Sequence, residues 1–216
     1  MKKLIFLFIT MVIMVPAFSQ TSAKSSVNPY DKLDQVLSPF EDMTEYALDG
    51  NIAAVNKAMV HIERLQNQGI FSSNLTNSDF FNQKTAELKK LVIKKDLQKA
   101  ALISASLFKN NMTHFKYASS LKRQLQIEHL DYMGYQILAL LKQNKADWKA
   151  VADAVAIGQK NWLALSAKVK DYNMKDSFNQ LFKGLNLSIK QKNHKMITIL
   201  GYMDLSLVDV LESSFK

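Results

Sequence analysis

Apolar residues recur at steps of three and four along most of the chain after residue 40. This spacing places them on one face of an α-helix, whereas the strict alternation typical of a half-buried strand is almost absent. The three prolines are Pro16, Pro29 and Pro39, so no later residue forces a helix to end. The pattern therefore predicts an all-α protein built as a helical bundle.

The clearest helix is predicted to start after Asp147, whose side chain suits an N-cap position. Its apolar stripe consists of Trp148, Val151, Val155, Gly158, Trp162, Leu165 and Val169. Gly158 leaves a gap in this stripe between the two indoles. The gap is either an apolar slot for a flat ligand, walled by Trp148 and Trp162, or a place where a facing helix comes close. We favour close packing, because large aromatic residues on a helical seam usually belong to the core.

A similar helix occurs earlier in the chain, with Asn51 at the cap position, 96 residues before Asp147. Its stripe consists of Ile52, Val55, Met59, Ile62, Gln66 and Gly69. A second marker, the string D-x-F-N-Q, starts at Asp79 and again at Asp176, 97 residues later. Two markers at nearly the same spacing predict an internal duplication.

Two tandem units follow from this duplication, 31–110 and 111–216, packed as one domain. Each unit is predicted to contain three helices in an up-down-up arrangement. The predicted ranges are 31–49, 51–68 and 79–109, then 112–143, 147–171 and 176–214. Short turns make the first two helices of each unit antiparallel neighbours. Breaks near 94–96 and 192–193 would divide the long third helices, so we expect six to eight helices in total.

The first 19 residues show the three parts of a secretory signal peptide. Lys2 and Lys3 form the basic part, an apolar run of twelve residues ends at Val15, and small residues at 17 and 19 precede a cut at Gln20. The run is shorter than the roughly twenty apolar residues of a membrane span. Residues 20–30 are predicted to be a flexible leader. We therefore expect an exported protein, periplasmic or secreted, with no transmembrane segment after cleavage.

The charge of the chain narrows the range of partners. Its formal net charge is +9, or +7 once Lys2 and Lys3 are removed, and it has no cysteine. Export without disulfides indicates a bacterial envelope compartment. Arginine occurs only at Arg64 and Arg123, which argues against sequence-specific recognition of nucleic acid. We expect an unknown envelope protein or an anionic envelope polymer as the partner.

Two lysine-rich stretches occupy matching positions on the predicted long helices. They consist of Lys89, Lys90, Lys94, Lys95 and Lys99, and of Lys183, Lys190, Lys192 and Lys195. They form either a belt that contacts an anionic polymer or an ordinary solvated face. The solvated face is the favoured interpretation.

Histidine and methionine offer the candidate metal and cofactor ligands. Each of His61, His114, His129 and His194 has a methionine within four positions. Only His129 and Met133, at positions i and i+4, share a helix face, so they are the candidate copper ligands. No cofactor is predicted outright. Non-covalent haem held by one histidine and by Met43 or Met203 is retained as an alternative, whereas covalent haem would need cysteines.

Catalytic signatures are missing from the sequence. It contains no G-x-S-x-G, Gly-rich phosphate loop or H-E-x-x-H motif. The clustered carboxylates Glu41, Asp42 and Glu45 are assigned to the first turns of a helix, where the helix dipole favours them. We therefore predict a non-enzymatic exported bundle with a binding or scaffolding role in the bacterial cell envelope. The alternative is a periplasmic carrier of copper or haem through His and Met ligands inside the bundle.

Overall fold

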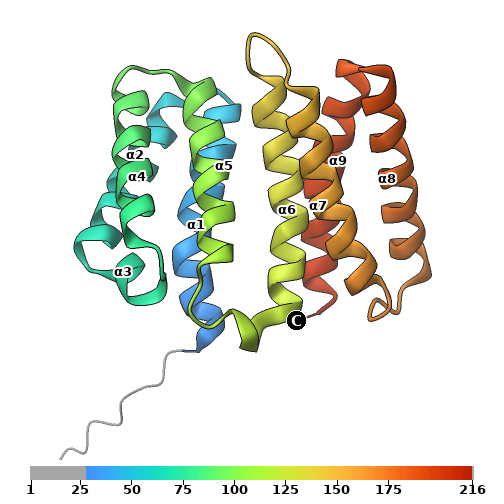
Figure 1. Cartoon of the computed structure of the whole chain (residues 1–216), viewed down its shortest axis with the longest axis horizontal. Coiled ribbons are helices and arrows are strands. Elements are labelled where there is room, and N and C mark those ends of the chain that lie inside the picture. The colour runs from blue at the N-terminus through green and yellow to red at the C-terminus, as the bar shows by residue number, and fades with distance from the viewer. Residues whose placement is uncertain (1–27, 216) are drawn as a thin grey trace, which may run out of the picture.

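A computed structural model of the chain describes residues 28–215, which form nine α-helices and one 3-10 helix (Figure 1). The elements are α1 (Pro29–Leu48), α2 (Ile52–Asn67), α3 (Ile70–Asn74), α4 (Ser78–Ile93), α5 (Leu97–Thr113), η1 (Ala118–Leu121), α6 (Lys122–Leu141), α7 (Trp148–Ser166), α8 (Tyr172–Gln191) and α9 (His194–Ser213). The prediction of an all-α helical bundle is confirmed. The predicted signal peptide and the leader up to residue 27 lie outside the described residues.

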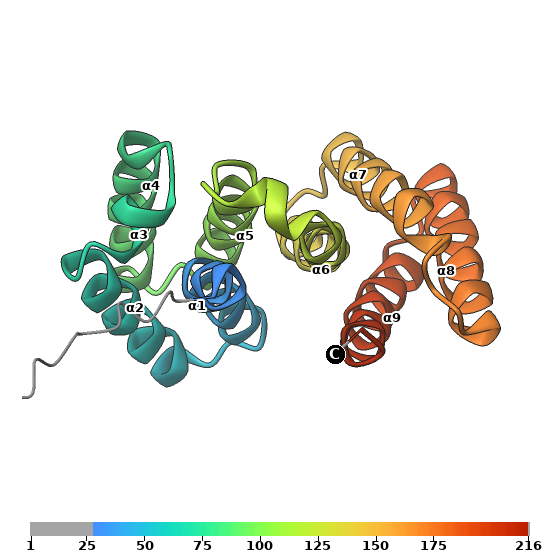
Figure 2. The ribbon, with the colours of Figure 1, turned by 90° about the horizontal axis from the view of Figure 1, so that it is seen from below.

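The long helices form two four-helix groups side by side. In the first group α1 packs against α2 and α5, and α4 packs against α5. In the second group α6 packs against α7 and α9, and α8 packs against α7 and α9 as well. Each group encloses its own apolar core. Helices α5 and α6 join the groups, and the end-on view of Figure 2 shows α6 between the two halves.

Asparagine and aspartate side chains start seven of the nine α-helices in the described part. The caps predicted at Asn51 and Asp147 are both present: Asn51 Oδ1 accepts from the Ala54 N–H at 3.1 Å, and Asp147 Oδ1 accepts from the Ala150 N–H at 3.0 Å. Each cap of this kind stabilises its helix by about 1 kcal/mol.

The long third helix of each predicted unit is in fact two helices. The chain breaks between α4 and α5 and between α8 and α9, at the two places considered from the sequence. At each break a lysine adopts a left-handed conformation, Lys95 with φ of 56° and Lys192 with φ of 51°, and the next residue caps the following helix. The prediction of three helices per unit was therefore too low. The short helix α3, which was not predicted, brings the total in the described residues above the expected six to eight.

Several features recur at the spacing of the predicted duplication. The left-handed lysines lie 97 residues apart. Gln66 donates a hydrogen bond to Asn82 at 2.9 Å, and Trp162, at the matching position of its helix, donates to Asn179 at 3.1 Å. These parallels are compatible with a duplication, which stays a prediction.

The connection between the two halves differs from the predicted ranges. Helix α5 continues through the predicted boundary at 110–111, and the helix expected from residue 112 begins at Lys122. The intervening residues pair with the α3–α4 connection: the Thr76 N–H donates to the His114 carbonyl and the Lys116 N–H donates to the Asn74 carbonyl, each at 2.9 Å. This pairing joins residues far apart in the chain, so helical periodicity does not reveal it.

The gap at Gly158 is filled by a side chain from α6. The Met133 thioether lies where a Cβ on Gly158 would be, and Met133 Cβ and Cγ would each be 3.1 Å from that Cβ. Trp162 is 2% exposed and stacks on Phe178, with ring centroids 4.3 Å apart, while Trp148 lies partly buried at the edge of the same core. The arrangement agrees with the close-packing interpretation of Gly158.

We predict that Gly158→Leu lowers the free energy of unfolding by about 1–3 kcal/mol, because the added side chain must displace the buried Met133. Urea unfolding followed by circular dichroism measures the change. In a Met133→Ala background the same substitution should raise stability, because leucine then fills vacated space. Equal effects of Gly158→Leu in both backgrounds would contradict the packing explanation.

Candidate functional site: an acidic pocket between three helices

A small cavity of about 140 Å³ lies between α1, α6 and α9. Its lining consists of Tyr30, Leu33, Asp34, Leu37, Ser38, Glu41, Glu128 and Glu212. The buried Asp131 lies one turn beyond Glu128 on α6. We call the group Glu41, Glu128, Asp131 and Glu212, with this cavity, the acidic pocket.

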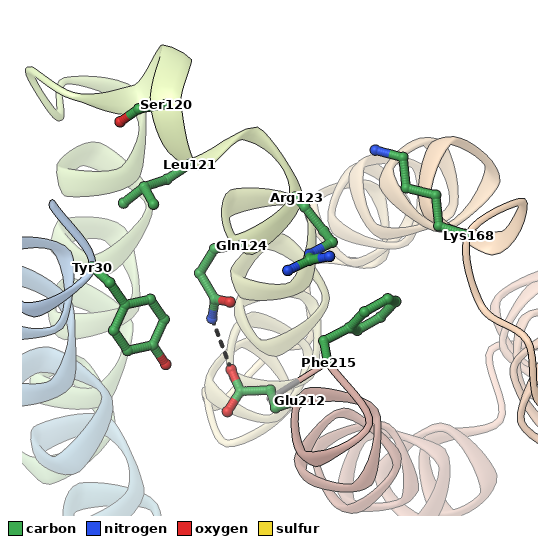
Figure 3. Close-up of a pocket in the computed structure, with 8 residues that line it drawn as sticks. All are labelled: Tyr30, Ser120, Leu121, Arg123, Gln124, Lys168, Glu212 and Phe215. Atoms are coloured by element: carbon green, nitrogen blue, oxygen red, sulfur yellow. Dashed lines mark hydrogen bonds between the residues drawn. The ribbon is translucent and has the colours of Figure 1, made fainter. Parts of the chain in front are cut away.

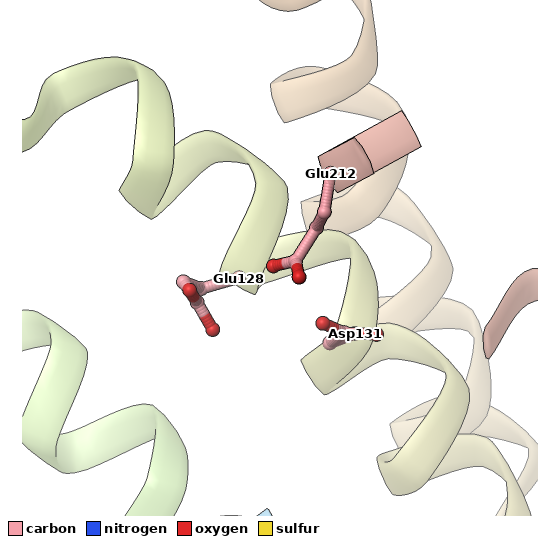
Figure 4. A group of neighbouring side chains, drawn as sticks. All are labelled: Glu128, Asp131 and Glu212. Carbon is pink, nitrogen blue, oxygen red and sulfur yellow. The ribbon is translucent and has the colours of Figure 1, made fainter. Parts of the chain in front are cut away.

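Three helices place these carboxylates together. Glu128 and Asp131 are three residues apart on α6, so they share one helix face. Glu212 comes from the last turn of α9, which packs against α6, and Glu41 comes from α1. One carboxylate oxygen from each of Glu128, Asp131 and Glu212 lies within 4.8 Å of the others (Figure 4).

Gln124 and Tyr135 donate hydrogen bonds to carboxylates of the acidic pocket. Gln124 Nε2 donates to Glu128 Oε1 at 2.7 Å and to Glu212 Oε1 at 3.3 Å. The Tyr135 hydroxyl donates to Glu41 Oε1 at 3.4 Å. Asp131 is 6% exposed, and no described residue donates a hydrogen bond to its side chain. Its carboxyl group is thus buried beside other acids without a donor.

Burial and mutual repulsion shift these acids toward their protonated forms. Burial raises the pKa of Glu128 to about 8, and the charge of Glu212 adds to the effect while the Gln124 hydrogen bond opposes it. The pKa of Glu41 rises to about 7, again through burial first and then the charges of Glu212 and Asp42. The pKa of Asp131 is also well above its usual range, for the same reasons. Near neutral pH the acidic pocket therefore holds protons that a cation can replace.

Further acids lie near the acidic pocket. Asp209 contributes to the raised pKa values of both Glu41 and Glu45. The four salt bridges among the described residues are Lys84–Glu87, Lys89–Glu63, Lys99–Asp96 and Lys149–Asp153. None of these involves Glu41, Glu128 or Asp131. A chain with net positive charge thus concentrates negative charge at this one junction.

A wider opening of about 730 Å³ adjoins the acidic pocket and shares Tyr30 and Glu212 with it (Figure 3). The remaining lining residues are Ser120, Leu121, Arg123, Gln124, Lys168 and Phe215. The Arg123 guanidinium lies over the Phe215 ring, 4.8 Å from its centroid. The opening gives small ligands a route from solvent to the carboxylates.

The candidate copper ligands lie on α6 but have different surroundings. Met133 is fully buried, with its thioether against Gly158. His129 is partly buried, and its Nδ1 has no hydrogen-bond partner among the described residues. Burial lowers the pKa of His129, and the positive charges of Lys109 and Lys160 lower it further. These two lysines also disfavour a bound cation, so the copper site stays a prediction without added support.

The other proposed ligands are not brought together. His61 lies within hydrogen-bond distance of Arg64, His114 of Thr76, and His194 of the Leu141 carbonyl. Met43 is fully buried in the first core, whereas Met203 is 48% exposed on α9.

The lysines of both lysine-rich stretches are exposed, as the solvated-face interpretation expects. The slot considered beside Trp148 and Trp162 is occupied at Gly158 by Met133.

Sequence reasoning did not identify the acidic pocket. The assignment of Glu41 to the first turns of a helix was wrong: α1 begins at Pro29, so Glu41 lies in its fourth turn, beyond the reach of the N-terminal dipole. The usable signal was the pair Glu128 and Asp131, two acids three residues apart on one helix face. Glu212 lies more than 80 residues from them, and only the fold brings it close.

Compared with protein-family models, curated proteins and solved structures, the chain matches none, so its site has to be interpreted from its own geometry. Within residues 28–215, no helix has both the length and the apolar character that crossing a membrane requires.

We predict that stability falls as pH rises from 5 to 8 when divalent cations are chelated. The folded pKa values of Glu41 and Glu128 exceed those of the unfolded chain, so the folded state binds more protons in this range and loses stability as they leave. From pH 5, the folded pKa of Glu41 lies about two units higher and that of Glu128 about three units higher, so at about 1.4 kcal/mol per unit the decrease should be on the order of 5 kcal/mol. Chemical unfolding at several pH values measures it.

Glu128→Gln should reduce this pH dependence, because glutamine does not titrate. Asp153→Asn, which changes an exposed acid on α7, is the matched control and should follow the wild-type curve. A wild-type stability that is constant or rises from pH 5 to 8 contradicts the raised pKa values.

Proposed function

We propose that the protein is an exported, non-enzymatic binding protein of the bacterial cell envelope, and that it binds a hard divalent cation in the acidic pocket. The N-terminal sequence pattern supports export, and the donor set supports the class of ligand. Glu128, Asp131 and Glu212 offer only carboxylate oxygens, which suit Ca²⁺, Mg²⁺ and Mn²⁺ better than copper.

The spacing of the carboxylates fits one ion. Calcium–oxygen distances are about 2.3–2.6 Å, so two oxygens on opposite sides of one ion lie up to about 5 Å apart. The three carboxylate oxygens are within 4.8 Å of one another. Their separations therefore require little movement when an ion enters.

The observation that carries the proposal is the buried carboxyl group of Asp131. It is 6% exposed, faces Glu128 and Glu212, and accepts no hydrogen bond from a described residue. A buried polar group without a partner costs free energy, and a buried charge costs much more unless it is paired or coordinates a metal. A divalent cation supplies this compensation without a new side chain.

The cavity leaves room for water as well as the ion. Its volume of about 140 Å³ exceeds the roughly 30 Å³ that one water occupies in the liquid, so several waters fit beside a cation. Waters would complete the coordination of Ca²⁺ or Mg²⁺, which use more oxygens than three side chains offer. Glu41, in the cavity lining, is placed to accept hydrogen bonds from such waters.

Titration calorimetry tests this proposal on the chain without its signal peptide, after removal of bound metal with a chelator. CaCl₂, MgCl₂ and MnCl₂ are titrated separately at pH 7.5. We expect saturable binding of at least one ion, with proton release, because the raised pKa values leave protons on Glu128 and Glu41. At a free concentration 100 times the Kd, the ion should stabilise the fold by about 2.7 kcal/mol.

Asp131→Asn should weaken binding at least tenfold, because it removes the most buried ligand charge. The metal-free variant should be as stable as the wild type or more so, since it lacks a buried acid, and this separates lost binding from lost folding. Asp153→Asn is the matched surface control and should bind normally. If none of the three salts gives saturable heat, or if Asp131→Asn binds as the wild type does, the proposed function is wrong.

A further inference from the structure

Helix α9 carries five of the eleven large apolar side chains that are exposed in the described part of the chain. They are Met196, Ile199, Tyr202, Met203 and Val210, each between 45% and 56% exposed. The opposite side of α9 supplies its share of the second core through buried residues such as Ile197, Val208 and Leu211. Helix α9 is therefore apolar on two faces, and only one of them is covered.

The exposed residues form a continuous stripe. Met196, Met203 and Val210 follow one another at intervals of seven residues, and Ile199 lies between the first two, which is the spacing of a helix–helix seam. We call these four residues the α9 stripe. It extends over about 21 Å at 1.5 Å per residue. A shallow depression beside it is lined by Ile199, Tyr202, Met203, Ser206 and Leu207, and it can receive side chains from a facing helix.

We propose that a second copy of this chain covers the α9 stripe, with the two α9 helices antiparallel about a twofold axis at Met203. The α9 stripe has the symmetry that such an axis requires. Met196 lies seven residues before Met203 and Val210 lies seven residues after it. Met196 of one copy therefore faces Val210 of the second copy, and Val210 faces Met196. Ile199 lies four residues before Met203 and faces Leu207 of the second copy, four residues after it. Self-complementarity of this kind defines a twofold interface between identical chains.

Charges at the ends of the α9 stripe favour the antiparallel orientation. Lys195 lies at its N-terminal end and Asp209 near its C-terminal end, both exposed and on the same edge. In the antiparallel pair, Asp209 of the second copy lies at the level of residue 197, within two residues of Lys195. Opposite charges then meet twice. A parallel pair would place the charged edges of the two copies on opposite sides of the seam, so these opposite charges would not meet.

The interface leaves the acidic pocket open. Glu212 follows Met203 by nine residues, which at 100° per residue places it on the opposite side of α9. No residue of the α9 stripe lines the acidic pocket, so a second copy on the α9 stripe does not block that site. One helix pair is small compared with specific interfaces of roughly 1,200–2,000 Å², so we expect a concentration-dependent dimer in the micromolar range.

Sedimentation velocity on the chain without its signal peptide, from about 1 to 500 µM, tests the proposal. We expect a reversible shift from monomer to dimer across this range. Met203→Glu should shift the transition at least tenfold to higher concentration, because it places two like charges at the axis. Leu187→Glu alters a comparably exposed apolar residue on α8, outside the α9 stripe, and should leave the transition unchanged. A monomer at every concentration, or a dimer that Met203→Glu does not weaken, overturns the proposal.

A charge exchange tests the antiparallel orientation. Lys195→Glu and Asp209→Lys should each weaken the dimer, and the double variant should restore it, because the two opposite-charge pairs are then re-formed in reverse. Single variants with no effect, or a double variant weaker than both, would overturn the antiparallel arrangement. Circular dichroism confirms that each variant is folded. Removal of residues 20–27 should leave the dimer intact. If it abolishes the dimer, association depends on that segment and not on a second α9 bound to the α9 stripe, and the proposal is wrong.

Discussion

The fold depends on one helix, α6, that is packed on nearly every side. Thirteen of its twenty residues are buried, more than in any other helix of the described chain. Tyr135 and Leu138 belong to the first core, whereas Met133 and Ile137 belong to the second. A helix that contributes side chains to two separate cores is stable only when both of those sides are packed. The two four-helix groups therefore meet along α6, and neither group can bury its share of apolar surface without it.

Close packing around α6 requires small residues on it and on its neighbours. Gly134 faces Leu205 and Asp204 of α9, so that a Cβ at this position would lie 2.6 Å from a Leu205 methyl. A Cβ at Gly201 would lie 3.1 Å from a Leu138 methyl carbon, and Gly158 makes room for Met133. A larger residue at Gly134 would require the Leu205 and Asp204 side chains of α9 to move. The same tight junction holds Asp131 out of water, so the packing constraint and the unusual acid have a common cause.

Local signals in the sequence predicted most of the long helices, two of their caps and one packing detail. Periodicity predicted the helices, Asn51 and Asp147 predicted caps, and the gap at Gly158 predicted a close contact, because each of these depends on residues a few positions apart. The break at Lys95 was less visible, since a left-handed lysine has no distinctive side-chain signature and apolar residues continue on both sides. The acidic pocket depends on which helices become neighbours, and helical periodicity contains no information about the pairing of α6 with α9. Glu212 therefore looked like an ordinary charge near the end of the chain.

Helix α9 connects the two proposed sites through its last two turns. Glu212 faces α6 and Val210 faces outward, only two residues earlier, so both depend on the same terminal turns remaining helical. Helix ends fray because their last carbonyl groups lack partners within the helix. A cation bound by Glu212 together with Glu128 and Asp131 would hold this end against α6 and keep Val210 in register with Met196 of a second copy. Any such coupling has to be reciprocal, so a cation that strengthens the dimer must itself bind more tightly to the dimer. The two sites lie on opposite sides of α9. They are coupled because both require the last two turns of this helix to remain helical.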